Sequence, residues 1–443
     1  MSKTRPNAVT IVIAAYAALV FAVLGITPLW LDELQQLVLG RENVPALLRW
    51  VQLNPGASPL PYLAQRAIVD LLGTSPFAAR IPAALCSIAA AALFAALCAR
   101  FGIRSPAWAT ALFLAFPLQF RYALEARGYS QGLLCVLLSL LLFLRARERG
   151  AVRPAALYGI SVACGLYSQP LTILPVFGCL LWLVGEREVG SQTKRLLLGA
   201  VSISVLLFLP WYLLQRQALE ASATMELFFF SWRQLSPLGL LHDLSGGGYI
   251  CSAALLCAAA FGFVRLRNRR LLACLAISTL LGPVIVDALV NYFFAPRQLL
   301  FAAPVLALCA AHGIERLRGG RLPWLGFAAM LAFFASAAVS DFRLATIPKD
   351  GFGAQAGVLA RLPADVCVAV APPNHLPYYL LLRPELERSI CTEPLTAAHV
   401  VAAISPYSTL LEREQLSQLL SLSYDQAAVL QSGAGAIVVY RRR

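Results

Sequence analysis

Apolar stretches of about 15–21 residues recur from Ala8 to Ser340, separated by more polar connections. Each is close to the length that a helix needs to cross a bilayer. Lipid offers the backbone no hydrogen-bond partners, so helices are the form in which such segments cross it. The pattern predicts a polytopic α-helical membrane protein with 11 transmembrane helices, at residues 8–28, 77–99, 105–120, 128–144, 154–169, 170–185, 196–214, 248–264, 271–290, 298–314 and 322–340.

Basic residues gather in the short connections on one side of these spans. With the N-terminus inside, the inner segments carry Lys3 and Arg5, Arg100 and Arg104, Arg145 to Arg153, Arg187 to Arg195, Arg265 to Arg270, and Arg316 to Arg321. This positive-inside pattern predicts a cytoplasmic N-terminus and an extracytoplasmic C-terminal region in a bacterial inner membrane. It accounts for the net charge of +14 without a nucleic-acid partner, because no basic stripe is interleaved with aromatic residues.

Three outer regions follow from this topology. Residues 29–76 have apolar residues at helical spacing, at Leu34, Leu37 and Val38 and again at Leu47, Leu48 and Val51, which indicates helices lying in the membrane interface. Residues 215–247 form an outer loop with an aromatic run and the pair His242–Asp243. The third region is the tail from residue 342.

The tail has a different character from the rest of the chain. Strands are predicted at residues 366–370, 400–404 and 436–440, and helices at 375–382 and 408–421. This alternation predicts a small C-terminal α/β periplasmic domain, residues 342–443, after a membrane domain of residues 1–341. A disulfide between Cys367 and Cys391 fits an extracytoplasmic location, and two free thiols are the alternative.

Asp32 and Glu33 stand directly after the first apolar span. Carboxylates at a membrane boundary are costly to desolvate, so they are functional candidates. Other polar clusters occur at outer helix ends, in residues 121–129, 215–247 and 291–298. One outer cavity collecting these groups would offer a carboxylate base and arginines for an anion.

Several motifs occur in the order seen in one family. They are Trp30-Leu31-Asp32-Glu33, Ser58-Pro59-Leu60-Pro61-Tyr62, the segment 72–82 ending in Arg80-Ile81-Pro82, Glu125-Ala126-Arg127-Gly128-Tyr129-Ser130, and Pro296-Arg297 with Pro304. In these residues the chain resembles the GT-C membrane glycosyltransferases, specifically the protein O-mannosyltransferase and aminoarabinose-transferase-like group. The resemblance implies a GT-C fold and transfer of a sugar, with inversion, from a polyprenyl-phosphate carrier on the outer face.

The resemblance also suggests roles for individual residues. Asp32 would be the catalytic base that accepts the proton of an acceptor hydroxyl, with Glu33 orienting it. Arg127 and Arg297 would bind the departing phosphate through charge-assisted hydrogen bonds. A phosphate leaves as a stabilised anion, so one base and binding cations suffice where a glycosidase needs two carboxylates. The other candidate substrate-binding residues are Glu125, Tyr129, Tyr62 and Arg80.

Each candidate has a structural alternative. Asp32 and Glu33 would also suit a helix N-terminus. Glu125 would pair with Arg121 four residues before it. Arg80 would anchor the chain near the headgroups. Relatives can bind a divalent metal, but no compact ligand set is evident, so no cofactor is assigned and a divalent metal stays an open alternative.

A transporter or flippase for lipid-linked glycans, and an oligosaccharide ligase with a pyrophosphate-linked donor, are the alternative functions. The expected partners are the lipid-linked donor and an acceptor that is a glycolipid, lipopolysaccharide, cell-wall glycan or protein. The sequence identifies neither the sugar nor the acceptor, nor the oligomeric state.

Overall fold

The computed structural model describes residues 7–54, 57–222, 249–266, 268–290, 295–318, 323–363, 366–390, 397–405, 407, 410–432 and 435–443. The chain forms two compact units. The membrane unit comprises Met1–Gly25 and Asn43–Ala345, and the C-terminal unit comprises Ile26–Glu42 and Thr346–Arg443. The sequence places a domain boundary at residue 341; the C-terminal unit also takes in the segment 26–42, which precedes most of the membrane helices.

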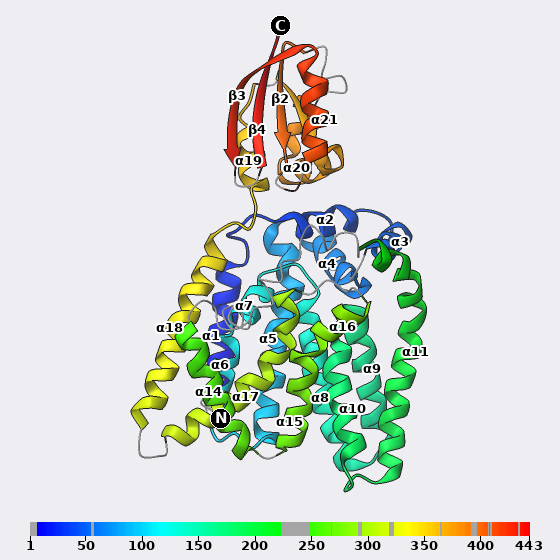
Figure 1. Ribbon diagram of the computed structural model, residues 1–443, viewed down its shortest axis with the longest axis vertical. Coiled ribbons are helices and arrows are strands. Elements are labelled where there is room, and N and C mark those ends of the chain that lie inside the picture. Colours follow the sequence, from blue (N-terminus) through cyan, green and yellow to red (C-terminus); the bar gives the residue numbers. More distant parts are fainter. Residues whose placement is uncertain are drawn as a thin grey trace, which may run out of the picture. The chain divides into compact units, whose positions relative to one another are not determined.

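The membrane unit is helical throughout its described residues (Figure 1). Its elements are α1 (Ala8–Val23), α3 (Val44–Leu53), α4 (Pro59–Leu72), α5 (Pro76–Arg100), α6 (Pro106–Leu114), α7 (Pro117–Ala123), α8 (Tyr129–Arg149), α9 (Val152–Ser168), η1 (Pro170–Thr172), α10 (Ile173–Gly185), α11 (Ser191–Ser222), α14 (Tyr249–Arg265), α15 (Arg269–Leu280), α16 (Gly282–Val290), η3 (Pro296–Ala302), α17 (Ala303–Arg318) and α18 (Pro323–Thr346). A helix or a pair of helices lies at each of the predicted spans.

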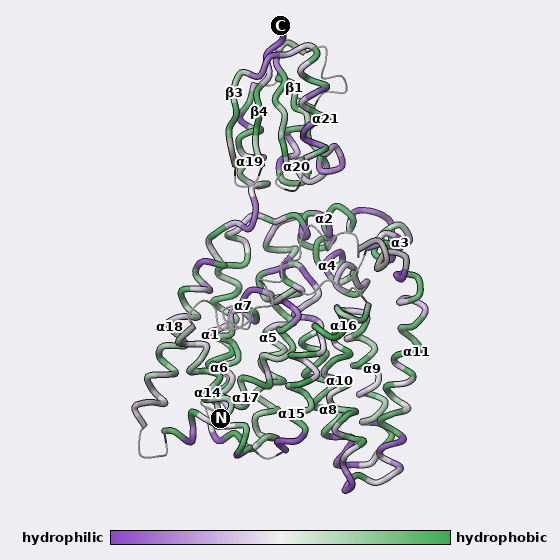
Figure 2. Tube along the Cα trace, viewed as in Figure 1, coloured by the Kyte–Doolittle hydropathy of each residue, from purple (hydrophilic) through white to green (hydrophobic). Residues whose placement is uncertain are grey.

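Apolar residues run along these helices, and hydrophilic stretches lie at their ends (Figure 2). Among the described residues, 4 helices are long and apolar enough to cross a membrane, or up to 5 with one bent pair. Three shorter apolar helices, Ala8–Val23, Pro170–Gly185 and Ser252–Arg265, are close to that length. The prediction of a multi-span helical membrane protein is therefore confirmed, and the number of 11 spans stays a prediction.

Two predicted spans are broken helices. The span 105–120 divides into α6 and α7, because Pro117 has no N–H to continue the ladder and starts a new helix. The span 271–290 divides into α15 and α16, which meet at 41° beside Gly282 and Pro283.

Helices α14 and α17 approach so closely that only glycine fits where they cross. A Cβ on Gly262 would lie 1.9 Å from the carbonyl oxygen of Cys309, and one on Gly313 would lie 2.0 Å from that of Ala258. Small residues allow this approach between membrane helices, where van der Waals packing is a main source of association energy.

The C-terminal unit contains a four-stranded sheet in the order β1-β2-β4-β3. The strands are β1 (Cys367–Ala371), β2 (His399–Ile404), β3 (Tyr424–Ser432) and β4 (Gly435–Arg442), and the helical elements are α2 (Leu31–Gly40), α19 (Phe352–Leu359), η4 (Pro373–His375), α20 (Leu376–Leu382), η5 (Pro384–Ser389) and α21 (Leu410–Ser421). Strands β1 and β2 are parallel, whereas β4 pairs antiparallel with β2 and β3. A small C-terminal mixed sheet accompanied by helices is thus present, as the alternation of strands and helices predicted.

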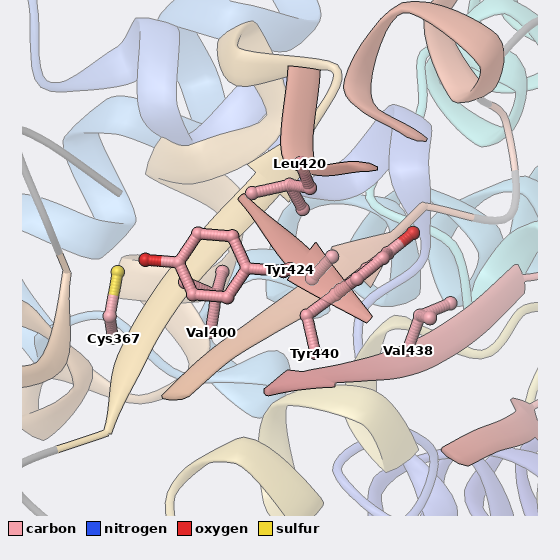
Figure 3. Close-up of a cluster of buried hydrophobic side chains, with 7 residues drawn as sticks. Cys367, Val400, Leu420, Tyr424, Val438 and Tyr440 are labelled. Carbon is pink, nitrogen blue, oxygen red and sulfur yellow. The ribbon is translucent and has the colours of Figure 1, made fainter. Parts of the chain in front are cut away.

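The core of this sheet contains the buried side chains Cys367, Val400, Ala402, Leu420, Tyr424, Val438 and Tyr440 (Figure 3). The Tyr424 hydroxyl donates to the carbonyl of Ala397 at 2.6 Å, so the one strongly polar group of that ring is satisfied. Cys367 takes part in a disulfide. Cys391 lies outside the described residues, so its pairing with Cys367 stays a prediction.

Candidate active site

In the membrane unit, the predicted motif at residues 125–130 forms the turn between α7 and α8. The Arg121 Nε lies 3.0 Å from Glu125 Oε1, and the Glu125 side chain is only 6% exposed. The Arg127 N–H donates to the Glu125 carbonyl at 2.7 Å, which tightens the turn. The alternative expected for Glu125, a local pair with Arg121, is therefore present and offsets its buried charge.

Two tyrosines join this turn to the late arginine. The Tyr122 and Tyr129 rings pack with centroids 4.5 Å apart, and Arg297 Cζ lies 5.8 Å from the Tyr129 centroid. The charges of Glu125, Arg121 and Arg297 all act on the buried Tyr122 hydroxyl. Residues far apart in the sequence are thus brought together by the packing of α7, α8 and η3.

Tyr62 reaches the same region through α4. Its buried ring lies 6.2 Å from that of Trp50, centroid to centroid. A Cβ on Gly128 would lie 2.5 Å from Pro61 Cγ and 2.5 Å from the carbonyl oxygen of Ser168. The chain next to Tyr62 and the end of α9 therefore pack directly on the turn that carries Arg127.

Arg80 has a clear structural contact. It is 3% exposed, and its Nη1 donates to the carbonyl of Leu24 at 3.0 Å. Leu24 follows the last residue of α1, so Arg80 satisfies a carbonyl that the helix end leaves open. The role that this contact supports is structural, but it differs from the expected anchor near the headgroups, because the buried side chain bonds to the protein backbone.

In the C-terminal unit, Asp32 and Glu33 lie in the first turn of α2. The buried Glu33 carboxylate accepts a hydrogen bond from the Trp30 N–H at 3.3 Å, in a capping box. Asp32 is partly exposed, one residue earlier. The two acids therefore differ in environment: Glu33 fixes the start of the helix, and Asp32 is accessible there.

Asp350 joins the start of α2 to α19. Its carboxylate accepts from the Leu31 N–H at 2.9 Å and from the Phe352 N–H at 3.2 Å. Burial raises the pKa of Asp350, while these two hydrogen bonds act in the opposite direction. The Lys349 Nζ lies 4.1 Å from the Trp30 ring centroid, a cation–π contact next to Asp350.

A cluster of aromatic residues surrounds Phe352, which is fully buried. Its ring centroid lies 6.0 Å from that of Tyr378, 5.8 Å from that of His375 and 6.2 Å from that of Tyr407. Burial raises the pKa of Tyr378 and, to about 12, that of Tyr407, and the negative charge of Asp32 contributes to both shifts. The two hydroxyls therefore lie within electrostatic reach of Asp32.

Comparisons with known proteins give a consistent picture. The family model described as dolichyl-phosphate-mannose-protein mannosyltransferase matches residues 55–213. The structure of ArnT from Cupriavidus metallidurans, solved without ligand and bound to undecaprenyl phosphate, superposes with a TM-score of 0.64 at 15% identity over 97% of each chain. The chain resembles the GT-C membrane glycosyltransferases.

A second GT-C relative has a larger chain. The arabinofuranosyltransferase AftD from Mycobacteria superposes with a TM-score of 0.51 at 16% identity, over 97% of this chain and 41% of its own. Among curated proteins, none matches this chain in sequence. The resemblance stated from the motifs is confirmed. At these low sequence identities, the structural matches show a similarity of fold alone.

The GT-C resemblance left a bound divalent metal ion as an open alternative. Within the described residues, no three His, Cys, Asp or Glu side chains lie close enough together to hold one. Glu33 accepts from the Trp30 amide, and its neighbour Asp32 belongs to no group of three such side chains within the described residues. These residues do not make a metal-binding set, so no step is assigned to a metal. His242, Asp243 and the aromatic run near them lie outside the described residues.

Sequence reasoning missed Asp350, Tyr378 and Tyr407. An acid after Pro348-Lys349 gives no signal by itself, since its partner, the Leu31 amide, is 319 positions away. The tyrosines follow two predicted strands, at 366–370 and 400–404, and the parallel pairing of those strands would have indicated that they lie near one another.

Proposed function

We propose that the chain is an inverting glycosyltransferase that moves a sugar from a polyprenyl-phosphate donor to an acceptor on the outer face of a bacterial inner membrane. The observation that carries the proposal is the cluster formed by Glu125, Arg121, Tyr122, Tyr129 and Arg297 in the membrane unit. It combines arginines with aromatic rings in a fold whose relative ArnT was solved with undecaprenyl phosphate bound.

Arg127 and Arg297 bind the donor phosphate in this proposal. Arg121 lies 3.0 Å from Glu125, which offsets its charge, so the proposal assigns the donor phosphate to Arg127 and Arg297 rather than to Arg121. Guanidinium groups form charge-assisted, often bidentate, hydrogen bonds to phosphate. Such bonds strengthen as the phosphate gains charge on leaving, and this lowers the barrier.

Asp32 is the base. The acceptor oxygen forms a bond to the anomeric carbon, the bond from that carbon to the phosphate oxygen breaks, and the acceptor proton passes to the Asp32 carboxylate. A single displacement of this kind inverts the configuration. Glu33 is a positioning residue, because its bond to the Trp30 amide fixes the helix turn on which Asp32 lies.

The test uses purified protein in lipid nanodiscs and a panel of radiolabelled polyprenyl-phosphate sugars, with membrane extract as acceptor. We expect Asp32→Asn to lower transfer by about 10²–10⁴-fold. Arg127→Gln and Arg297→Gln should each lower it by about 10²–10³-fold. Asp70→Asn, on a side chain 64% exposed, and Arg343→Gln, also exposed, are matched controls that should transfer at the wild-type rate.

Two outcomes would contradict the proposal. Transfer at the wild-type rate by Asp32→Asn, at equal expression, would exclude it as the base. Absence of transfer from every polyprenyl-phosphate donor, together with transfer from a pyrophosphate-linked donor or movement of a labelled lipid-linked glycan across the bilayer, would favour the ligase or the transporter.

A further inference from the structure

The aromatic cluster around Phe352 lies at one particular end of the sheet. His375 and Tyr378 follow the carboxyl end of β1, and Ser405 and Tyr407 follow that of β2, the parallel neighbour. Figure 1 shows α20 at the end of the sheet toward which the β2 arrow points. In α/β sheets, ligands bind in the loops beyond the carboxyl ends of parallel strands.

Polar contacts hold the two loops together. His375 Nδ1 lies 2.8 Å from Ser405 Oγ, and the Ser405 N–H donates to the Ala371 carbonyl at 2.9 Å. The Tyr407 N–H donates to Ser405 Oγ at 3.2 Å. The Tyr407 amide is therefore tied through Ser405 to β1 as well as to its own strand.

The three rings differ in exposure in a way that suits a binding surface at Tyr407. Phe352 is fully buried and Tyr378 is 9% exposed, whereas Tyr407 is 37% exposed. The Phe352 and Tyr407 rings are nearly parallel, with 17° between their planes, so the outer ring is backed by the buried one. A backed aromatic face loses little conformational freedom when a ligand stacks on it.

The charge next to these rings indicates which class of ligand this surface would bind. Asp32 is partly exposed in the first turn of α2, and α2 packs against α20, the helix that carries Tyr378. The negative charge of Asp32 contributes to the raised pKa of Tyr378 and of Tyr407. A carboxylate and two phenol hydroxyls beside an aromatic face offer hydrogen-bond acceptors and donors around an apolar surface. A sugar ring has the complementary pattern, with hydroxyl groups at its edge and C–H groups on its face.

We propose that Tyr407, backed by Phe352, forms a carbohydrate-binding platform with Asp32 and the Tyr378 hydroxyl as its polar groups, and that the acceptor is therefore a sugar. The role of Asp32 as base rests on the proposed function, whereas binding of a saccharide to the platform does not. On this platform the acceptor hydroxyl faces Asp32, which takes its proton as the oxygen forms the new glycosidic bond.

The experiment measures saccharide binding without any donor. Full-length protein in nanodiscs is titrated with methyl glycosides of glucose, galactose and N-acetylglucosamine at millimolar concentration, and saturation-transfer NMR reports contact. A Ser/Thr-containing peptide is the non-sugar probe. We expect Tyr407→Ala to weaken saccharide binding about tenfold, the size expected when a large aromatic contact is lost, and Tyr407→Phe to retain binding. Leu430→Ala, on a side chain 57% exposed on β3, is the control and should bind as wild type.

The outcomes separate this proposal from the proposed function. Saccharide binding that Tyr407→Ala weakens supports the platform even where no donor is turned over, in which case the transferase proposal fails alone. Equal binding by wild type and Tyr407→Ala would overturn the platform. Binding of the peptide with no binding of any saccharide would also overturn it, whatever transfer is measured.

Discussion

Replacing Gly128 by alanine tests whether the turn between α7 and α8 positions the arginines. The backbone at Gly128 has φ −71° and ψ 0°, which alanine adopts without strain. The added methyl would meet Pro61 Cγ and the Ser168 carbonyl oxygen at 2.5 Å each. Ordinary contact begins at 3.4 Å, so the required displacement is 3.4 − 2.5 = 0.9 Å. The carbonyl belongs to backbone and cannot rotate away.

A displacement of this size has two consequences. Overpacking costs about 1–3 kcal/mol of folding free energy, and in a long chain such a cost lowers the melting temperature by only a few degrees. Misplacing a catalytic group by about 1 Å can cost about 10²-fold in rate. Since Arg127 adjoins Gly128, we expect kcat/KM for the lipid-linked donor to fall about 10²-fold, with a melting temperature lower by only a few degrees.

The assay is transfer from the lipid-phosphate donor in nanodiscs, with thermal unfolding followed in parallel. Gly199→Ala is the matched control, because its Cβ would meet nothing within 4 Å on helix α11. Alanine there should preserve both activity and stability. Full activity and an unchanged melting temperature in Gly128→Ala would refute the close approach; a large loss of stability in both variants would refute the steric explanation.

Three further predictions concern the C-terminal unit. Cys391→Ser should free the Cys367 thiol, detected as one additional alkylation by mass spectrometry without reductant, and an unchanged mass would exclude the pairing. Burial lowers the pKa of His375 from 6.5, and the charge of Glu412 only partly offsets this. The folded state therefore binds fewer protons than the unfolded state, and the free energy of unfolding falls as the pH drops below about 6.5. Hydrogen exchange of the β1 and β2 peptides at pH 5 and 7.5 should show this weakening, and His375→Gln should abolish it. Asp350→Ala should lower the free energy of unfolding by about 0.5–2 kcal/mol, because the cap at Leu31 is lost. It should also lower kcat for transfer and leave the KM for the donor unchanged; a changed donor KM would contradict this.

Much of the fold could be predicted because its determinants are periodic or local. Each long apolar run became a helix or a pair of helices, and strands β1, β2 and β4 were found. Strand β3 was missed, because Asp425 to Leu430 are all exposed and no alternation marks a buried face. Helix α19 was missed as well, since its eight residues include two glycines that weaken a helical pattern.

The candidate site could be predicted only where one segment carries its own chemistry. The motif at residues 125–130 and the acids at 32 and 33 are visible in the sequence, and so are the capping and pairing alternatives that the structure displays for Glu33 and Glu125. The partners that fix or surround them could not be predicted. Asp350 reaches Leu31 across 319 positions, and Tyr407 meets Phe352 only through the parallel pairing of β1 and β2.

The contact between Asp350 and Leu31 limits what a truncation can show. Deleting residues 345–443 would remove the aromatic cluster and, at the same time, the carboxylate that caps α2 next to Asp32. Loss of transfer in such a truncation would follow equally from a lost acceptor surface and from a misplaced base. Point variants separate the two, because Tyr407→Ala leaves the Asp350 cap intact and Asp350→Ala removes none of the rings, although it also removes the hydrogen bond from the Phe352 N–H. The acceptor surface is supported only where Tyr407→Ala raises the KM for the acceptor and Asp350→Ala lowers kcat.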